Sequence, residues 1–487
     1  MLSVMALAGA RKAPFSAEAL DRMAAVVGPR YAIRDAAGMT AYLVEPRDKF
    51  HGRAAMVVRP GTTDEVSRLL AIANEARIGI VPQSGNTGLV GGQTPSETGD
   101  EVVLVLDRLD QVRDLDVIDN TMTVEAGLTL KTVQEKAREA GRLYPLSLAA
   151  EGSCRIGGNL ATNAGGIGVI AYGTARELCL GLEVVLADGR IWNGLRHLRK
   201  DNTGYDLKDL FIGSEGTLGV ITAAVLKLFP LPRARATAWV GVTAPRGGLK
   251  LLAIAREAGA GVVTAIELVP RIGVEFTMRH AGTTDPLGSP FPWYVLLEFS
   301  GAADEPALDA GMESVLASAL EQGVIGDAAI ATSEAQRMAL WRIRETLSEV
   351  QKLEGGSIKH DVSVPVSRIP EFIERASEAV QRLVPGARPV PFGHVGDGNI
   401  HFNVSQPVGA DKRAFLARWD EVAAAVHAIV LDLGGSISAE HGIGRLKRDL
   451  MPAIKSPVEL QLMRDLKRLL DPNGILNPGK LLPEADG

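Results

Sequence analysis

The stretch PQSGNTGLVGGQTP at residues 82–95 follows a strand-like apolar run and consists largely of glycine and small polar residues. Two further segments of the same half are similar: AEGSCRIGGNLATNAGGIGVIAYG at 150–173 and GSEGTLGVIT at 213–222. Glycine lacks a Cβ and permits positive φ, so backbone N–H groups in such segments can closely approach phosphate oxygens. Each segment alone fits an ordinary turn-rich loop. Three together, two of them after strand-like runs, predict a site for a diphosphate cofactor.

Two familiar phosphate-binding motifs do not account for these segments. No G-x-x-x-x-G-K-[ST] occurs, which argues against a P-loop nucleotide hydrolase. Gly166, Gly168 and Ala171 fit G-x-G-x-x-A. The NLATNAG before them is not a buried strand, however, so we do not expect a Rossmann site.

The rest of the chain predicts a mixture of helices and strands in more than one domain. Its 487 residues exceed the usual size of a single core, and its 46% hydrophobic and 23% charged composition is that of an ordinary folded protein. Pro- and Arg-rich LFPLPRARA (228–236) marks a domain boundary. Thr62 to Glu65 predicts a capped helix start, and so does Ser456 to Glu459 with Pro457 at the first helical position.

Together the glycine-rich segments resemble the FAD domain of the vanillyl-alcohol oxidase and p-cresol methylhydroxylase superfamily, from about residue 50 to 230. The resemblance implies that the first loop cradles the FAD pyrophosphate and that the tail returns to the flavin. Residues 82–95 contain no histidine, and Cys154 does not match the covalent cysteine pattern, so we expect non-covalent FAD. The cofactor-binding residues that the resemblance implies are Pro82, Ser84, Gly85, Asn86, Thr87, Gly88, Glu151, Gly152, Ser153, Gly157, Gly158, Asn163, Gly173, Glu215, Gly216, Ile221 and Asn477.

Three of the eight histidines lie in two glycine-flanked segments, GHVGDGNIHFNV (393–404) and SAEHGIGRL (438–446). His394 and His401 are seven residues apart and would lie on opposite faces of one continuous strand. The chain must therefore turn between them, and the glycines at 396–398 supply a turn. Both rings could then converge.

This clustering predicts a metal site. Imidazole and carboxylate ligands suit a divalent cation, so we predict that His394, His401 and Glu440 bind zinc or manganese. Neighbouring residues of an extended chain point apart, which leaves His441 as a catalytic base. Asn403 shares the strand face of His401. Ordinary histidines beside tight turns are the alternative.

The two histidine segments also resemble motifs of the FAD-linked D-2-hydroxy-acid dehydrogenases, a group that includes D-2-hydroxyglutarate and D-lactate dehydrogenases. The resemblance then covers nearly the whole chain. It implies an α+β fold in which a two-part FAD-binding domain is covered by an α+β capping domain with the substrate and metal sites. The predicted units are a lead-in segment (1–49), the FAD-binding domain (50–232), the cap (233–450) and a C-terminal segment that returns to the FAD domain (451–487).

The segments WRIRETLSEVQ (341–351) and SIKHDVSVP (357–365) bear on the substrate. Arg344 and Ser348 are four residues apart, on one face of a predicted helix, and Lys359 begins a predicted strand. A solvated helix face and a snorkelling lysine would explain the same residues. In D-2-hydroxyglutarate dehydrogenases, which the chain resembles most, an Arg, a Thr and a Lys with these spacings hold the distal carboxylate of the substrate. The implied substrate-binding residues are Arg344, Ser348, Lys359, Asn403 and His441.

The predicted reaction is oxidation of a D-2-hydroxy acid, foremost D-2-hydroxyglutarate to 2-oxoglutarate. His441 takes the hydroxyl proton, and FAD accepts the hydride at N5. D-lactate, glycolate and D-malate are the alternative substrates within the family. A flavin-carrying or metal-stabilised binding protein without turnover is the alternative outside it.

Charge and composition exclude some classes of binding partner and favour one cellular compartment. A net charge of -6 without a dense Lys/Arg run argues against nucleic acid, and no apolar run reaches the roughly 18 residues of a membrane span. Two cysteines, Cys154 and Cys179, suit a reducing compartment, so we expect a cytoplasmic protein. The expected partners are a small dicarboxylic hydroxy acid and a soluble electron acceptor such as electron-transfer flavoprotein, with a homodimer left open.

Overall fold

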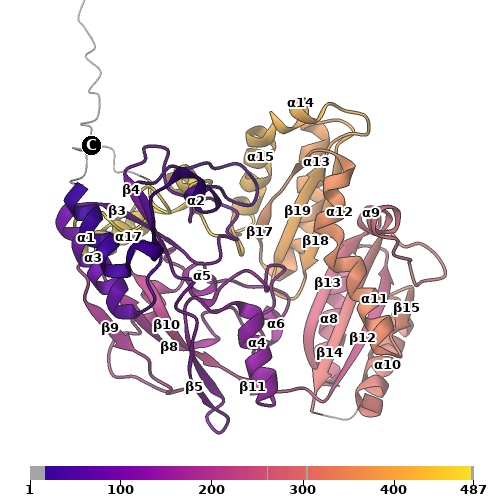
Figure 1. The fold of residues 1–487 in the computed structure, drawn as a ribbon. Coiled ribbons are helices and arrows are strands. Elements are labelled where there is room, and N and C mark those ends of the chain that lie inside the picture. The colour runs from indigo at the N-terminus through magenta and orange to yellow at the C-terminus, as the bar shows by residue number, and fades with distance from the viewer. Residues whose placement is uncertain (1–16, 260, 303–304, 484–487) are drawn as a thin grey trace, which may run out of the picture.

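A computed structural model describes residues 17–259, 261–302 and 305–483 of the chain. Residues 1–16 of the predicted lead-in segment lie outside this part. Figure 1 shows two halves side by side, an indigo-to-magenta half and a pink-to-orange half, and the yellow C-terminal segment lies against the first. The expected two-part α+β architecture is confirmed.

The first sheet of the N-terminal half is built around parallel strands. Its elements are α1 (Ala17–Val27), β1 (Ala32–Ile33), α2 (Ala36–Met39), β2 (Met56–Val58), α3 (Thr63–Ala76), β3 (Gly79–Gln83) and β4 (Glu101–Val105). Strands β2 and β3 pair parallel with β4, and β1 adds antiparallel to β2. The predicted start of α3 is confirmed, because the Thr62 hydroxyl accepts the N–H of Glu65. The Glu65 carboxylate reaches one residue further back and accepts the N–H of Gly61.

The second sheet of this half is antiparallel, with strand order β5-β6-β10-β8-β9. The elements of this part are β5 (Val112–Asp116), β6 (Thr121–Glu125), α4 (Leu130–Glu139), β7 (Arg142–Leu143), α5 (Ile156–Ala161), α6 (Val169–Tyr172), β8 (Cys179–Val185), β9 (Ile191–Gly194), α7 (Lys208–Phe211), β10 (Val220–Lys227) and β11 (Phe229–Pro230). One apolar core serves both sheets, from Ala19 to Leu228, and it also takes in Ile475 and Leu476.

The C-terminal half contains an eight-stranded sheet in the order β15-β12-β14-β13-β18-β19-β16, with β17 also paired to β19. Its elements are β12 (Ala234–Val242), α8 (Pro245–Ala258), β13 (Val262–Pro270), α9 (Arg271–Ala281), β14 (Trp293–Gly301), α10 (Glu305–Glu321), β15 (Asp327–Ile330), α11 (Glu334–Glu345), α12 (Leu347–Val350), β16 (Ser357–Ile358), β17 (Asp361–Ser363), α13 (Ile369–Leu383), β18 (Arg388–His394), β19 (Asn399–Ser405), α14 (Lys412–Leu416) and α15 (Trp419–Asp432). We call this half the cap.

Helices cover both faces of the cap sheet. The apolar faces of α8, α10, α13 and α15 contribute to one core, and those of α9, α11 and α12 to another. The alternation of β13 follows from this arrangement, because Ile266 and Leu268 join the first core while Ala265 and Val269 join the second. Glu267 therefore shares the face of α11 and is completely buried there. A buried carboxylate of this kind requires partners.

The tail returns to the first sheet through α16 (Met451–Ile454) and α17 (Pro457–Leu470). The predicted capping box of α17 is confirmed in both directions between Ser456 and Glu459. Beyond the helix, Leu476 forms a parallel bridge with Ile80 of β3. This bridge places the following residue, Asn477, beside the first glycine-rich loop.

Three local expectations differ from the structure. The predicted helix that carries Arg344 and Ser348 is interrupted after Glu345, where the Thr346 hydroxyl donates to the carbonyl of Arg342. Lys359 does not begin a strand but lies between β16 and β17. The backbone at Glu440 and His441 is bent rather than extended. Within the described ranges, no helix is long and apolar enough to cross a membrane.

Candidate active site

A cavity of about 290 Å³ lies where the three glycine-rich segments meet. Glu440 and His441 of the cap form part of its wall, so the cavity lies at the junction of the two halves. We call it the flavin cavity. The predicted cofactor residues that line it are Pro82, Ser84, Gly85, Asn86, Thr87, Gly88, Gly157, Gly158, Glu215, Gly216, Ile221 and Asn477.

Three amide side chains in the flavin cavity each have one polar atom that could bind a ligand. Asn86 Oδ1, Asn159 Nδ2 and Asn477 Oδ1 are buried and have no hydrogen-bond partner among the residues that the structure describes, and all three residues line the cavity. Each such atom costs about 1–3 kcal/mol if it stays unsatisfied. The backbone of Asn86 and Asn477 is also left-handed, with φ of 52° and 42°. These residues fit a large polar cofactor such as FAD.

Sequence analysis did not single out Asn159, although the amide stands directly after two glycines in RIGGNLATNAG. It lies on α5, and its Nδ2 has no hydrogen-bond partner within the described part of the chain. An asparagine inside a helix that starts with glycines was the available signal, since such a helix can approach a ligand closely.

The remaining predicted cofactor residues, Glu151, Gly152, Ser153, Asn163 and Gly173, do not line the flavin cavity. Asn163 Oδ1 instead accepts hydrogen bonds from Thr174 Oγ1 at 2.8 Å and from the N–H of Arg176 at 3.0 Å. The Ser153 carbonyl lies 2.3 Å from the place that a Cβ on Gly85 would occupy, so the first loop needs glycine there. The part of these residues in FAD binding stays a prediction.

Cys154 lines the flavin cavity and is the cysteine nearest to the cofactor site. Burial raises the pKa of its thiol to about 11, which keeps the sulfur protonated and weakly nucleophilic near neutral pH. This chemistry supports the expectation of non-covalent FAD.

The predicted metal ligands converge on a hairpin. Strands β18 and β19 pair antiparallel, and the glycines at 396–398 make the turn as expected. The rings of His394 and His401 are 5.6 Å apart, and His394 Nε2 lies 3.7 Å from Glu440 Oε1. One ligand atom from each of His394, His401 and Glu440 lies within 4.8 Å of the others. Ligands about 2 Å from a tetrahedral zinc lie roughly 3.3 Å apart, so the group fits a divalent cation after a small contraction.

Glu267 holds His394 in the orientation that a metal ligand needs. The two residues are cross-strand partners on β13 and β18. Glu267 Oε1 accepts from His394 Nδ1 at 2.5 Å, and Glu267 Oε2 accepts from Arg344 Nε at 2.6 Å. A carboxylate on the second nitrogen of a ligating histidine fixes the ring and leaves Nε2 for the metal. Sequence analysis missed Glu267, whose one signal was a single acid in the apolar run VVTAIELVP.

Asp361 organises the loop of Glu440 and His441, and it too was missed. Its Oδ2 accepts the N–H groups of both residues, each at 2.9 Å, and lies 3.3 Å from His441 Nδ1. Its Oδ1 accepts from Asn399 Nδ2 at 3.0 Å. Asp361, Glu440 and His441 form a second group that could hold a cation. We favour the His394 group, because the oxygens of Asp361 already have hydrogen-bond partners.

Burial and charge shift the pKa values of the ligands in opposite directions. Burial disfavours the charged form of His394, but Glu267 outweighs it and raises the pKa of His394 to about 9. Burial raises the pKa of Glu440 to about 7. Burial lowers the pKa of His401 to about 3, and it lowers the pKa of His441 in spite of Asp361. His401 and His441 are therefore neutral near pH 7.

The predicted substrate-binding residues differ in their burial and in their hydrogen-bond partners. Arg344 is buried and bonded to Glu267, with its guanidinium 4.8 Å from the centre of the Phe392 ring. Ser348 is exposed, and Lys359 is half-buried. Asn403 Nδ2 donates to Gln351 Oε1 at 2.8 Å. Arg344 and Ser348 therefore differ in burial, although the backbone between them keeps right-handed helical dihedrals at Thr346.

Glu215 links the flavin cavity to the loop that follows Glu440 and His441. Its carboxylate accepts the N–H groups of Ile443 at 2.7 Å and Gly444 at 2.8 Å. Asn477 Nδ2 donates to the carbonyl of Glu215 at 2.7 Å. Loops from three distant parts of the chain therefore meet at this one residue.

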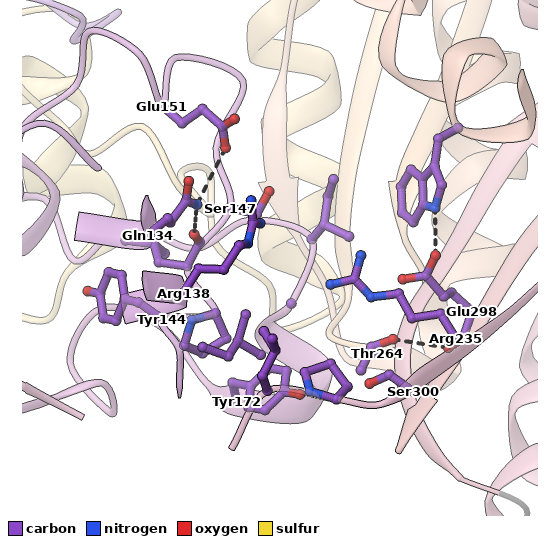
Figure 2. A pocket seen from close by; sticks show the side chains of 18 of the residues that line it. Gln134, Arg138, Tyr144, Ser147, Glu151, Tyr172, Arg235, Thr264, Glu298 and Ser300 are labelled. Carbon is purple, nitrogen blue, oxygen red and sulfur yellow. Dashed lines mark hydrogen bonds between the residues drawn. The ribbon is translucent and has the colours of Figure 1, made fainter. Parts of the chain in front are cut away.

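A second cavity of about 400 Å³ lies between α4 and the 143–151 loop on one side and the cap sheet with α11 on the other. Figure 2 shows Arg138 and Arg235 entering it from the two halves, and Glu298 bonded to a tryptophan indole. Glu151 lines this cavity rather than the flavin cavity, while Leu148 to Ala150 line the latter. The 143–151 loop thus separates the two cavities.

Comparisons with known proteins agree with this arrangement. Residues 54–194 match the family model described as FAD binding domain, and residues 231–481 match FAD linked oxidases, C-terminal domain. A protein of Oryza sativa subsp. indica named probable D-2-hydroxyglutarate dehydrogenase, mitochondrial, is 39% identical over 94% of this chain and 81% of its own. The Bos taurus D-2-hydroxyglutarate dehydrogenase, mitochondrial, is 38% identical over 97% of this chain and 85% of its own.

The fold has a solved counterpart in p-cresol methylhydroxylase with substrate bound, at a TM-score of 0.74 and 17% identity, covering 95% of this chain and 96% of that one. Fold and site together define an FAD-dependent oxidoreductase. The chain belongs to the FAD-linked oxidases, and within them to the family that contains the D-2-hydroxyglutarate dehydrogenases.

Proposed function

We propose that this chain oxidises D-2-hydroxyglutarate to 2-oxoglutarate with FAD and a divalent metal. One observation carries the proposal: the side chains of His394, His401 and Glu440 converge beside His441, at the wall of the cavity that fits FAD. A hydroxy acid that chelates a metal there would present its hydroxyl to His441 and its Cα hydrogen to the flavin.

The residues of the chain divide the chemistry between them. When bound, the metal lowers the pKa of the substrate hydroxyl, and FAD supplies the hydride acceptor. Asp361 Oδ2 faces His441 Nδ1, which leaves His441 Nε2 to take the hydroxyl proton. Because burial lowers the pKa of His441, the imidazole is neutral and able to act as a base near pH 7.

Support for a dicarboxylate comes from Lys359 and from the relatives. Burial, together with the charge of Arg47, lowers the pKa of Lys359 to about 8, and among the described residues Lys359 has neither an ion pair nor a hydrogen bond. A second substrate carboxylate would compensate this charge. The rice and cattle relatives carry the name D-2-hydroxyglutarate dehydrogenase.

Anaerobic flavin reduction tests the function directly. The FAD- and metal-loaded protein is mixed with D-2-hydroxyglutarate, D-malate, D-lactate and glycolate, and flavin bleaching is followed. We expect D-2-hydroxyglutarate to have the highest kcat/KM. Equal or faster reduction by D-lactate or glycolate would overturn the substrate assignment, and no bleaching by any acid would favour a binding protein.

The metal, the acceptor and the compartment belong to the same proposal. We expect zinc or manganese in the His394 group and non-covalent FAD that acid precipitation releases completely. A soluble acceptor such as electron-transfer flavoprotein, a cytoplasmic location and a homodimer remain our expectations. The rice and cattle relatives are named mitochondrial, so fractionation of the native cells is the relevant test of location.

A further inference from the structure

The second cavity, of about 400 Å³, has walls from both halves of the molecule. Helix α4 and the 143–151 loop form one wall, and strands β12 to β14 together with α11 form the other. Among the described residues, none lines both this cavity and the flavin cavity. The second cavity is therefore separate from the one that fits FAD, and the proposed oxidation does not use it.

The cap wall of the second cavity is polar on a sheet face that is apolar elsewhere. Arg235 and Ser300 are cross-strand partners on β12 and β14, and Thr237 and Glu298 form the pair two residues further along. Because side chains alternate along a strand, both pairs share the face of Trp239, which belongs to an apolar core. Glu298 and Ser300 are nevertheless buried, at 7% and 3% exposure. Polar groups that converge on a cavity in this way are typical of a ligand site.

Three of the seven charged side chains that line the second cavity already have partners. Glu298 accepts from the indole beside it in Figure 2, at 2.7 Å. Arg337 Nε donates to Glu334 at 2.7 Å, and Arg142 donates to a backbone carbonyl at 2.7 Å. The charge of Arg235 also acts on Glu334, but Arg337 holds that carboxylate.

The other four charged side chains of the second cavity are Arg138, Arg235, Glu151 and Glu345. Arg138 of α4 and Arg235 of β12 enter the cavity from opposite walls (Figure 2). Neither guanidinium has an ion pair or a hydrogen bond within the described part of the chain, and the same holds for the carboxylate of Glu345. Glu151 accepts one long hydrogen bond, from Gln134 at 3.4 Å. Two cations and two acids are thus available to a ligand.

The signs of these four charges decide which class of ligand fits. Glu151 and Glu345 would repel a polyanion, and the two arginines would repel a polyamine. Partial burial and the charge of Glu151 raise the pKa of Glu345, so a cationic group beside the two acids would stabilise both. A ligand that carries one charge of each sign is attracted by all four side chains.

We propose that the second cavity binds an amino acid, with its carboxylate between Arg138 and Arg235 and its ammonium group at Glu151 and Glu345. Ile167, which also lines the cavity, offers apolar surface to the side chain of such a ligand. Binding at this site does not depend on the identity of the substrate that the flavin oxidises.

Calorimetric titration of the FAD-loaded protein tests the class of ligand. The probes are L-leucine and L-glutamine, which share the zwitterion and differ in the side chain. N-acetyl-L-leucine retains only the negative charge, and L-leucinamide retains only the positive charge. We expect saturable binding of at least one of the two amino acids. We also expect each singly charged derivative to bind about tenfold more weakly than L-leucine, because it loses one set of charged contacts.

Substitutions in the second cavity locate the site. Arg138→Gln and Arg235→Gln should each weaken the Kd of the amino acid about tenfold, since each removes a charge-assisted hydrogen bond. Glu345→Gln should weaken amino-acid binding but strengthen binding of N-acetyl-L-leucine, because it removes a negative charge that repels an anion. A folding defect would not reverse the preference in this way. The FAD content of all three variants should equal that of wild type.

Arg382→Gln is the matched control. Arg382 lies on α13, is exposed, pairs with Glu378 at 3.6 Å and lines neither cavity. We expect its Kd values to stay within twofold of wild type.

Three outcomes would overturn the inference. The first is that neither L-leucine nor L-glutamine gives saturable binding to wild type. The second is that both arginine variants keep the wild-type Kd, which would place the amino acid elsewhere. The third is that N-acetyl-L-leucine or L-leucinamide binds as tightly as L-leucine, which would mean that the cavity selects one sign of charge.

Discussion

Glycines, amides and apolar side chains make up most of the flavin cavity wall, whereas the group of His394, His401 and Glu440 beside it consists of titratable side chains. In the cavity, glycines and left-handed asparagines bring N–H and amide groups to the ligand. In the cap, Glu267 and Asp361 arrange His394, His401, Glu440 and His441 through hydrogen bonds between strands. One region therefore depends on chain conformation and the other on proton equilibria.

This difference predicts how each region responds to a change of pH and to the loss of a single side chain. A wall made mostly of glycines and uncharged side chains has few groups that titrate, and the loss of one amide removes one hydrogen bond among many. A network of coupled charges responds to pH, and the loss of one member leaves its partners buried without compensation. The variants below test that contrast.

The largest expected effect is that of His441→Ala. We expect flavin reduction by the hydroxy acid to slow about 10²- to 10⁴-fold, because a positioned base contributes that much. FAD and metal contents should stay at the wild-type level, which absorbance and metal analysis measure. His280→Ala is the control, since His280 pairs with Glu354 away from both cavities. Loss of metal from His441→Ala would make the residue a ligand instead of a base.

Metal affinity should depend steeply on pH, while FAD affinity should not. His394 holds a proton below about pH 9 and Glu440 below about pH 7, and both must lose it to bind a metal. Affinity therefore falls as pH falls, about tenfold per unit between pH 9 and 7 and more steeply below 7. Competition with a chromogenic chelator at several pH values gives the slope. A metal affinity that does not change with pH would contradict the proposed protonation of His394 and Glu440.

Glu267→Gln should weaken metal binding about 10- to 100-fold, because the carboxylate orients His394 and keeps it basic. The substitution should also make metal affinity less dependent on pH above pH 7, because the pKa of His394 falls without Glu267. Glu298→Gln is the matched control: Glu298 is a buried acid on the neighbouring β14 and is bonded to Trp341 at 2.7 Å. The same metal loss in both variants would indicate general damage to the sheet.

Asn159→Ala should have the smallest effect, a loss of FAD affinity of about five- to tenfold, which corresponds to one hydrogen bond. The measurement is fluorescence of FAD titrated into the apoprotein. Metal affinity should stay unchanged, as in the control Asn473→Ala, whose amide bonds to Asn74 at 2.9 Å. An unchanged FAD affinity would mean that the unpaired Asn159 amide does not face the cofactor.

The sequence predicts the backbone-built region well because its signals are local. The first loop and its glycines occur in one short stretch, as do the caps of α3 and α17. The hairpin of His394 and His401 is equally local, since a turn connects its strands. Glu267 and Asp361 were missed because 127 and 80 residues separate them from the histidines they bond. Helix spacing alone could not show that Arg344 is buried against Glu267 while Ser348 is exposed.

The return of the tail also determines when the cofactor site can exist during synthesis. Ile80 meets Leu476 in the parallel bridge, and Asn477 hydrogen-bonds to Gly92 and Glu215 at 3.0 and 2.7 Å. The ribosome makes the glycine loops long before it makes residues 475–477, and the whole cap is translated in between. A nascent chain that ends before residue 475 lacks these three contacts. The cofactor cradle is therefore complete only once the cap and the tail have both been translated.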